Sequence, residues 1–212
     1  MGSDCTYNYC MYNYNRYERS HIGACMAKGS LAEIDAHAVL KQWLDDEARV
    51  AEAMAAGRIQ AEPVTRVELA AQPGIAAFDA MLSGRLPSAP IATTLDFLLI
   101  HAEPGVAIFQ GQPLERHYNP LGTVHGGWFA TLLDSALGCA VHSKLPAGKA
   151  YTTLELKLNI VRALTVDVPR VRAEGRVIHV GGQVATAEAS MVGPDGRLYA
   201  HATTTCLVFA AR

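Results

Sequence analysis

The sequence predicts an α+β fold in which one antiparallel sheet wraps around a single long helix, with a helical extension before it. Two observations support this prediction. From about residue 91 onward, the hydrophobic pattern gives two strands, one helix that is apolar on most sides, and then four strands. Before that point, apolar residues recur at helical spacing. We therefore expect three segments: a leader at 1–25, a helical extension at 26–90 and the α+β domain at 91–212.

Composition excludes several classes of partner. The formal net charge is −2, from 18 Lys and Arg against 20 Asp and Glu. A chain without a broad basic surface is not expected to bind nucleic acid. No stretch approaches the ~18 consecutive apolar residues of a membrane span, and the N-terminus lacks the order of a signal peptide. We expect a cytoplasmic protein with no membrane partner.

The leader and the cysteines predict no site of their own. Residues 1–25 alternate tyrosine with asparagine and cysteine, which is typical of a disordered or non-native leader. Five cysteines without a C-x-x-C pair fit neither a disulfide framework nor a zinc site. Cys139 and Cys206 are expected to be small core residues.

The extension should contain two helices. Ser30 and Glu33 form a capping box, and the apolar spacing after them predicts an amphipathic helix over about 31–56. Gly57 is the expected end of that helix. A second, short helix should follow Pro73, where proline suits the first helical turn.

The domain itself should begin with a hairpin and continue with a buried helix. Its last strands are separated by turns rich in glycine and proline. The cleanest strand alternates Thr152, Leu154, Leu156, Leu158 and Ile160 with polar residues, so one face should be buried and the other wet. The expected elements are strands 95–101 and 106–110, a helix at 127–143, and strands 152–160, 170–180, 183–192 and 198–209.

Two glycines precede the buried helix, in the segment His125-Gly126-Gly127. The free backbone N–H groups at such a helix start attract a polarised carbonyl or an oxyanion, because no side chain blocks the approach. Glycine pairs also make ordinary tight turns, so the segment alone is a weak indication of a site.

Asp134 strengthens the indication. It lies in the middle of an apolar helix, where an unpaired carboxylate costs several kcal/mol. A neighbouring hydroxyl, from Thr131 or Ser135, or a partner lysine would also account for it. Together with the glycine helix start, a catalytic role is the stronger hypothesis.

The spacing of these groups predicts an assembly. Gly127 and Asp134 are seven residues apart, which is about 10 Å along a helix axis. If both act on one substrate, Asp134 must come from a second protomer whose helix runs antiparallel. We therefore expect a two-fold homodimer with two equivalent sites.

The domain resembles the hotdog-fold acyl-CoA thioesterases of the PaaI type, which belong to the phenylacetate pathway. The resemblance covers about residues 91–209 and does not include the extension. The residues that carry it are Asn119, Gly122, His125, Gly126, Gly127, Asp134, the strand Thr153 to Arg162, and the segment Gly196-Arg-Leu-Tyr-Ala-His-Ala-Thr.

The resemblance implies hydrolysis of an aryl- or medium-chain acyl-CoA by a homo-oligomer, either a dimer or a homotetramer built as a dimer of dimers. The Gly127 amide would polarise the thioester carbonyl, and Asp134 of the facing subunit would be the general base or nucleophile. Asn119 and His125 would orient the substrate, and Thr153 would help to hold the attacking water. Expected contacts to substrate or CoA are Gly126, Trp128, Arg162, Arg176, Gly181 and Gly182.

Thioester hydrolysis requires neither a metal nor a cofactor beyond the CoA of the substrate, because a thiolate leaves readily. The histidines show no ligand spacing, so no metal site is predicted. Two alternatives remain: a CoA-linked hydratase or dehydratase of the same fold, and a non-catalytic acyl-CoA sensor.

Overall fold

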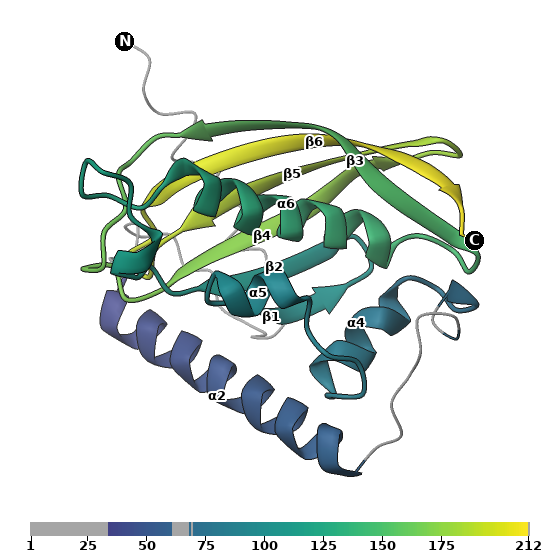
Figure 1. The fold of residues 1–212 in the computed structure, drawn as a ribbon, viewed down its shortest axis with the longest axis horizontal. Coiled ribbons are helices and arrows are strands. Elements are labelled where there is room, and N and C mark those ends of the chain that lie inside the picture. Colours follow the sequence, from purple (N-terminus) through teal and green to yellow (C-terminus); the bar gives the residue numbers. More distant parts are fainter. Residues whose placement is uncertain (1–33, 61–67, 69, 212) are drawn as a thin grey trace, which may run out of the picture.

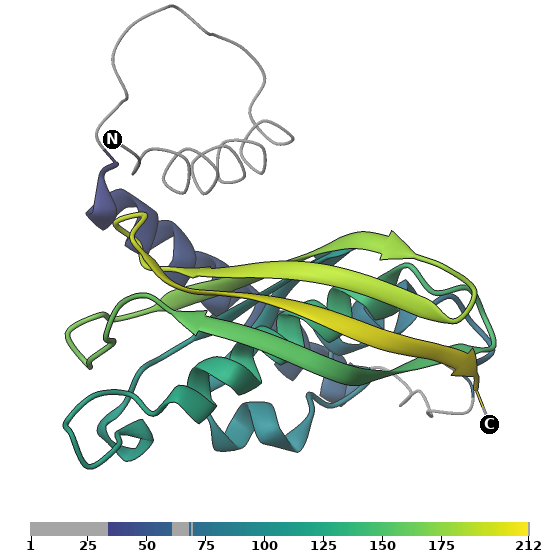
Figure 2. The same ribbon diagram turned by 90° about the horizontal axis from the view of Figure 1, so that it is seen from above.

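A computed structural model describes residues 34–60, 68 and 70–211. The leader and the Ser30–Glu33 capping box lie outside these ranges. Within them the predicted α+β plan is confirmed: a six-stranded antiparallel sheet curves around the long helix α6 (Figures 1 and 2).

The elements of the domain follow the predicted order, and the strands lie in the sheet as β1-β2-β4-β5-β6-β3. The edge strands are therefore β1 and β3. The domain comprises β1 (Phe97–Glu103), β2 (Val106–Gly111), the 3₁₀ helix η1 (Glu115–His117), α6 (Gly126–Ser143), β3 (Lys149–Ile160), β4 (Val171–Val180), β5 (Val184–Val192) and β6 (Leu198–Ala210). The preceding helices are α2 (Ala36–Gln60), α4 (Ile75–Leu82) and α5 (Pro90–Thr94).

Helix α6 supplies the centre of the core. Leu132, Leu133 and Leu137 are fully buried between the helix and the sheet. Small residues allow the close contact that the sequence predicts. A Cβ built on Gly175 of β4 would lie 2.2 Å from the carbonyl oxygen of Ala136, so only glycine lets this strand reach the helix.

Strand β3 departs from the predicted alternation. A β-bulge shifts its pairing with β6 between Thr153 and Glu155. Leu154 is 60% exposed, whereas Tyr151 and Thr153 lie on the side of α6. The prediction that Leu154 is buried and Thr153 wet was wrong. A single bulged residue reverses which side chains face the core, and period-two alternation cannot reveal it.

Helix α2 also differs from the prediction at both ends. It begins at Ala36, where the carboxylate of Asp35 accepts hydrogen bonds from the amides of His37 and Ala38 at 3.0 and 3.2 Å. It continues past Gly57 to Gln60. A Cβ on Gly57 would meet the Ser83 carbonyl oxygen at 1.6 Å, so this glycine provides a close contact instead of a helix end. No helix in the described ranges is long and apolar enough to cross a membrane.

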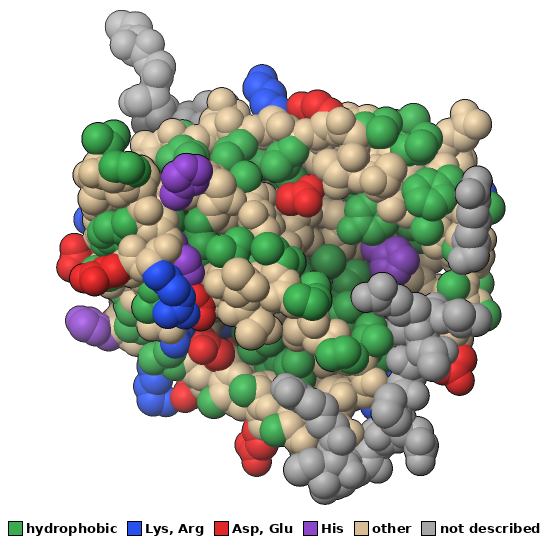
Figure 3. All heavy atoms as spheres, in the orientation of Figure 1, with side chains coloured by type: hydrophobic (Ala, Val, Ile, Leu, Met, Phe, Trp, Pro, Cys, Tyr) green, Lys and Arg blue, Asp and Glu red, His purple; other side chains and the backbone are tan. Residues whose placement is uncertain are grey.

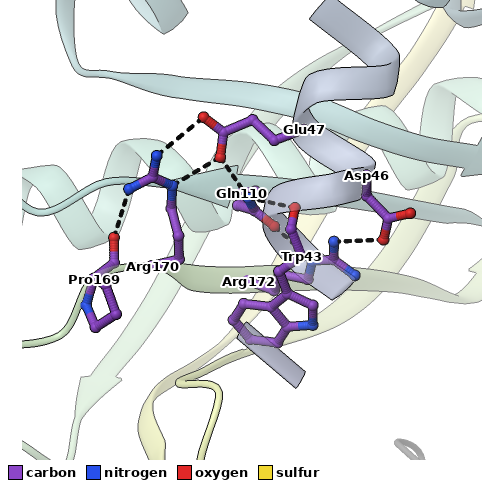
Figure 4. Close-up of polar contacts among 7 residues, drawn as sticks. All are labelled: Trp43, Asp46, Glu47, Gln110, Pro169, Arg170 and Arg172. Carbon is purple, nitrogen blue, oxygen red and sulfur yellow. Dashed lines mark hydrogen bonds and ion pairs between the residues drawn. The ribbon is translucent and has the colours of Figure 1, made fainter. Parts of the chain in front are cut away.

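Polar contacts attach α2 to the outer face of the sheet, the face opposite α6 (Figure 4). Arg172 of β4 bonds Asp46 and Gln110, both at 2.8 Å, and its guanidinium lies 4.7 Å from the centre of the Trp43 ring. Glu47 accepts from Arg170 at 2.7 Å and from Gln110 at 2.6 Å. These contacts hold α2 over β2 and β4, so the extension packs on the domain.

Candidate active site

The start of α6 is a capped glycine turn. His125 is the N-cap residue, with φ −64° and ψ 139°, and its Nδ1 accepts the N–H of Gly127 at 2.9 Å. His125 is exposed. Its own N–H donates to the carbonyl of His117 at 2.8 Å, which fixes the direction in which α6 begins.

This cap distinguishes the two glycine amides. The Gly127 N–H, expected to polarise the substrate, already donates to His125. The Gly126 N–H has no acceptor among the described residues. Of the two amides at this helix start, Gly126 therefore presents the free donor.

Asn119 organises the loop before α6. Its carboxamide oxygen accepts the N–H of Leu121 at 2.8 Å, and its Nδ2 donates to the Thr123 hydroxyl at 3.1 Å. Gly122 follows with φ +82°, a left-handed conformation that favours glycine. In this structure the Asn119 side chain is engaged within its own loop.

A buried pair that the sequence analysis missed supports the same loop. His117 has a side chain only 2% exposed, and its Nε2 lies 2.9 Å from Oδ2 of Asp96, although the two groups are not aligned for a linear hydrogen bond. The ring stacks on Trp128 at a centroid distance of 5.6 Å. The spacing of His117 from His125 did not reveal this pair, because its partner Asp96 lies 21 residues before His117 in the sequence.

Trp128, a residue expected to contact the substrate, packs in the core below the loop. Its side chain is buried, and its indole N–H donates to the carbonyl of Leu95 at 2.9 Å. The ring packs between His117 and Phe129. In this chain Trp128 therefore belongs to the core under the loop.

Asp134 projects from the middle of α6 and is partly buried. Its Oδ1 accepts the hydroxyl of Thr153, across on β3, at 3.1 Å. The hydroxyls of Thr131 and Ser135 bond instead to carbonyls of their own helix, at 2.9 and 2.8 Å. The hydroxyls of Thr131 and Ser135, which the sequence offered as partners, therefore do not bond the Asp134 carboxylate.

The groups around Asp134 are uncharged. Burial, followed by the nearby Asp134 carboxylate, raises the pKa of the Cys139 thiol to about 12. Burial also raises the pKa of Cys206 and of Tyr151. The side chain of Asp134 therefore lies among neutral thiols and a neutral phenol.

The residues expected to contact CoA are not brought together within one chain. Arg162 is exposed just after β3, at the end of the sheet near the start of α6. Gly181 and Gly182 lie in the β4–β5 turn, which the pairing of Val184 with Leu207 places at the opposite end. Arg176 pairs with Glu174. Within the described ranges, no three His, Cys, Asp or Glu side chains are grouped as a metal site requires.

Comparison with known proteins relates part of this chain to a known family. Residues 121–200 match the model of the thioesterase superfamily. A protein of Halobacterium salinarum that carries the provisional name of an esterase is 39% identical over 85 residues, which cover 39% of this chain and 54% of that protein. The match thus spans about half the length of that relative.

Solved structures show the same fold. A thioesterase-like, phenylacetic acid degradation-related protein of Ralstonia eutropha JMP134 is 28% identical, with a TM-score of 0.57 over 62% of this chain and 98% of its own. A thioesterase family protein of Silicibacter pomeroyi is 25% identical, with a TM-score of 0.54 over 58% of this chain and 91% of its own. The domain therefore has the hotdog fold, and its residues 121–200 are similar to the thioesterase superfamily.

Proposed function

We propose that this chain is a cytoplasmic acyl-CoA thioesterase of the PaaI type, which hydrolyses an aryl- or medium-chain acyl-CoA to the free acid and CoA. The observation that carries the proposal is the contact between Asp134 and the Thr153 hydroxyl, 3.1 Å apart, beside the open edge of the sheet. This contact places a carboxylate and a hydroxyl where a water molecule can bind both.

The chemistry needs few groups. Asp134 takes a proton from the water, whose oxygen attacks the thioester carbon. An amide at the start of α6 stabilises the oxyanion that forms on the carbonyl oxygen. The C–S bond then breaks, and the CoA thiolate receives the proton from Asp134. Asp134 acting as a nucleophile instead would attack the thioester carbon and expel the CoA thiolate, forming an anhydride; water would then hydrolyse the anhydride to the free acid and the Asp134 carboxylate, and the released proton would go to the thiolate.

Gly126 is the better candidate for the oxyanion donor, because the Gly127 N–H donates to His125. His125 would then act through its cap, which sets the direction of the Gly126 amide. Asn119 would act similarly by holding the loop. Arg162 and the β4–β5 turn with Gly181 and Gly182 remain the proposed CoA contacts. Because they lie at opposite ends of the sheet, one protomer would contribute Arg162 and the other the turn.

The proposed site is shared between two protomers. Gly126 and Asp134 are eight residues apart, about 12 Å along α6, so one chain cannot place both at one carbonyl. The side of α6 away from the sheet carries small, partly exposed residues, and charged side chains are sparse over it (Figure 3). Pairing of β3 with the β3 of a second copy would set the two α6 helices antiparallel.

A dimer of dimers would need a second surface. Helix α2 covers the outer face of the sheet over β2 and β4. The outer face beyond it exposes Leu154, Val184 and Leu207. A tetramer would therefore be built through this part of the sheet.

The test is turnover of an acyl-CoA panel, followed by release of free thiol. Asp134→Asn should lower kcat by about 10²-fold or more, since it removes the base at constant volume. Asp45→Asn, the same change on the exposed face of α2, is the matched control. Wild-type turnover in Asp134→Asn would overturn the mechanism.

A second pair of variants separates the two amides. Gly126 is the first helical residue, where proline fits without breaking the helix, and the extended His125 before it suits a proline. Gly126→Pro removes the N–H and adds a ring, whereas Gly126→Ala adds a Cβ at the same place and retains the N–H. We expect kcat to fall in Gly126→Pro alone, with CoA binding unchanged.

A further inference from the structure

Two hydrogen-bonding side chains lie beyond Asp134 along α6 and have no hydrogen-bond partner among the described residues. Nδ1 of His142 is buried without one. The hydroxyl of Tyr151, a half-buried residue, makes no hydrogen bond within the described ranges. Buried polar groups are usually satisfied, so the buried Nδ1 of His142, with a second hydrogen-bonding group beside it at a candidate site, points to a ligand.

The geometry lines these groups up with the carboxylate. Gly138 and His142 follow Asp134 by one and two helical turns, about 6 and 12 Å along the axis. Tyr151 precedes Thr153 on the same side of β3, and a Cβ on Gly138 would lie 2.4 Å from its hydroxyl oxygen. The rings of Tyr151 and His142 are 5.7 Å apart. Glycine at position 138 thus leaves room for the phenol just past Asp134.

Both groups are neutral. Burial, together with the nearby Cys139 and Asp134, raises the pKa of Tyr151, and burial lowers the pKa of His142. A neutral phenol and a neutral imidazole can each donate and accept one hydrogen bond. They suit an uncharged polar group better than a carboxylate or an ammonium.

The extension fixes one of these two side chains. Phe78 of α4 meets the His142 ring edge-on, with centroids 5.7 Å apart. The Gly74 amide donates to the carbonyl of Leu145 at 2.9 Å, and a Cβ on Gly74 would lie 1.9 Å from the His142 carbonyl oxygen. Helix α4 lies outside the residues that match the superfamily, so this end of the site depends on a part of the chain beyond the matched domain.

We propose that Tyr151 and His142 are specificity-determining residues that select acyl groups with a hydroxyl or another neutral hydrogen-bonding group about 6 to 12 Å from the thioester carbon. The proposal rests on the proposed thioesterase function, since it takes Asp134 as the position of the reacting carbon. The α4 helix would contribute by holding the His142 ring in place.

The experiment compares two acyl-CoAs of nearly equal shape, 6-hydroxyhexanoyl-CoA and heptanoyl-CoA, which differ by a hydroxyl in place of a methyl. The readout is the ratio of their kcat/KM values. Tyr151→Phe removes the phenol oxygen and keeps the packing on Gly138. We expect the ratio to fall about tenfold in this variant, because a site that hydrogen-bonds a substrate hydroxyl discriminates against its absence. His142→Leu should lower the ratio in the same direction.

Tyr118→Phe is the matched control, because the Tyr118 hydroxyl already accepts the N–H of Val166 at 2.8 Å. Its ratio should equal that of the wild type. An unchanged ratio in Tyr151→Phe would overturn the proposal, and so would an equal loss for both substrates, which would mean that the phenol serves the fold or the protomer contact.

Binding separates this proposal from the thioesterase function. Dissociation constants of the two acyl-CoAs for Asp134→Asn, measured by calorimetry, give the preference without turnover. The wild type could show no turnover while the protein still prefers the hydroxylated compound and loses that preference in Tyr151→Phe. That result would overturn the thioesterase function and support recognition of the substrate hydroxyl. Equal binding of both compounds to Asp134→Asn and to Asp134→Asn/Tyr151→Phe would overturn the recognition.

Discussion

The carboxylate of Asp96 lies 2.9 Å from Nε2 of His117 and reaches it from a left-handed backbone conformation, with φ at 54°. Among the described residues, Asp96 is the one non-glycine with a positive φ. Such a conformation is strained and persists where its surroundings fix it. Here the carboxylate lies against a buried imidazole, and the carbonyl oxygen of that same His117 accepts the N–H of His125. Asp96 thus supports the start of α6 through His117.

We predict that Asp96→Ala lowers the free energy of unfolding by about 1–3 kcal/mol, because it removes the carboxylate that lies 2.9 Å from the buried Nε2 of His117. Arg116 is the other partner of Asp96, and its side chain is 62% exposed. Arg116→Gln should therefore lower the free energy of unfolding by less than about 1 kcal/mol. Urea denaturation measures both. Equal losses would show that the exposed ion pair, and not the buried imidazole, accounts for Asp96.

The hydroxyl of Thr153 should be needed for turnover. Thr153→Val keeps the shape of the side chain and removes the donor to Asp134, so kcat should fall about 10- to 100-fold. Thr153→Ser keeps the donor and should retain most of the activity. Steady-state kinetics on one acyl-CoA decide this, and similar kcat values for the valine and serine variants would argue against a role for the hydroxyl.

The attachment of α2 should weaken in acid. Burial alone would raise the pKa of Glu47, but the hydrogen bonds from Arg170 and Gln110 outweigh it and hold the pKa below its ordinary value of 4.5. A carboxyl with a lowered pKa stabilises the fold above its unfolded pKa, and this contribution disappears as the pH falls through the folded pKa. We predict that Glu47→Gln is less stable than the wild type at pH 7 and that the difference shrinks below about pH 4.5.

Urea denaturation between pH 3.5 and 7 would measure that difference, with Asp45→Asn as the control for an exposed carboxylate of the same helix. A difference between wild type and Glu47→Gln that is independent of pH would contradict the prediction.

Sharing of the site between protomers can be tested by mixing two inactive proteins, Asp134→Asn and Gly126→Pro. In a heterodimer, one site carries both lesions and the other carries neither. After exchange of equal amounts, activity should recover to about a quarter of the wild type per subunit, by simple counting of dimers. Each variant exchanged with itself should stay inactive. Exchange confirmed by mass without any recovery would mean that both groups act within one chain or that one of them is not needed.

The sequence alone determined the fold class and most element positions, because burial repeats at 3.6 residues in α6 and at about two in the strands. It also singled out Asp134 as a candidate site residue, because a carboxylate in the middle of an apolar helix is costly to bury without a partner. The His125-Gly126-Gly127 start of α6 was visible for a similar reason, because glycine at a helix start leaves amides open.

Only the tertiary structure decided which groups meet. The bulge in β3 turned Thr153 toward Asp134, and the His125 cap occupied the Gly127 amide, leaving Gly126 free. The pairs Asp96–His117 and Tyr151–His142 each join residues on different elements, which only the packing of those elements brings into contact. Sequence periodicity records which side of an element is buried; which side chains come into contact depends on register, bulges and caps, and these are set by packing across the whole fold.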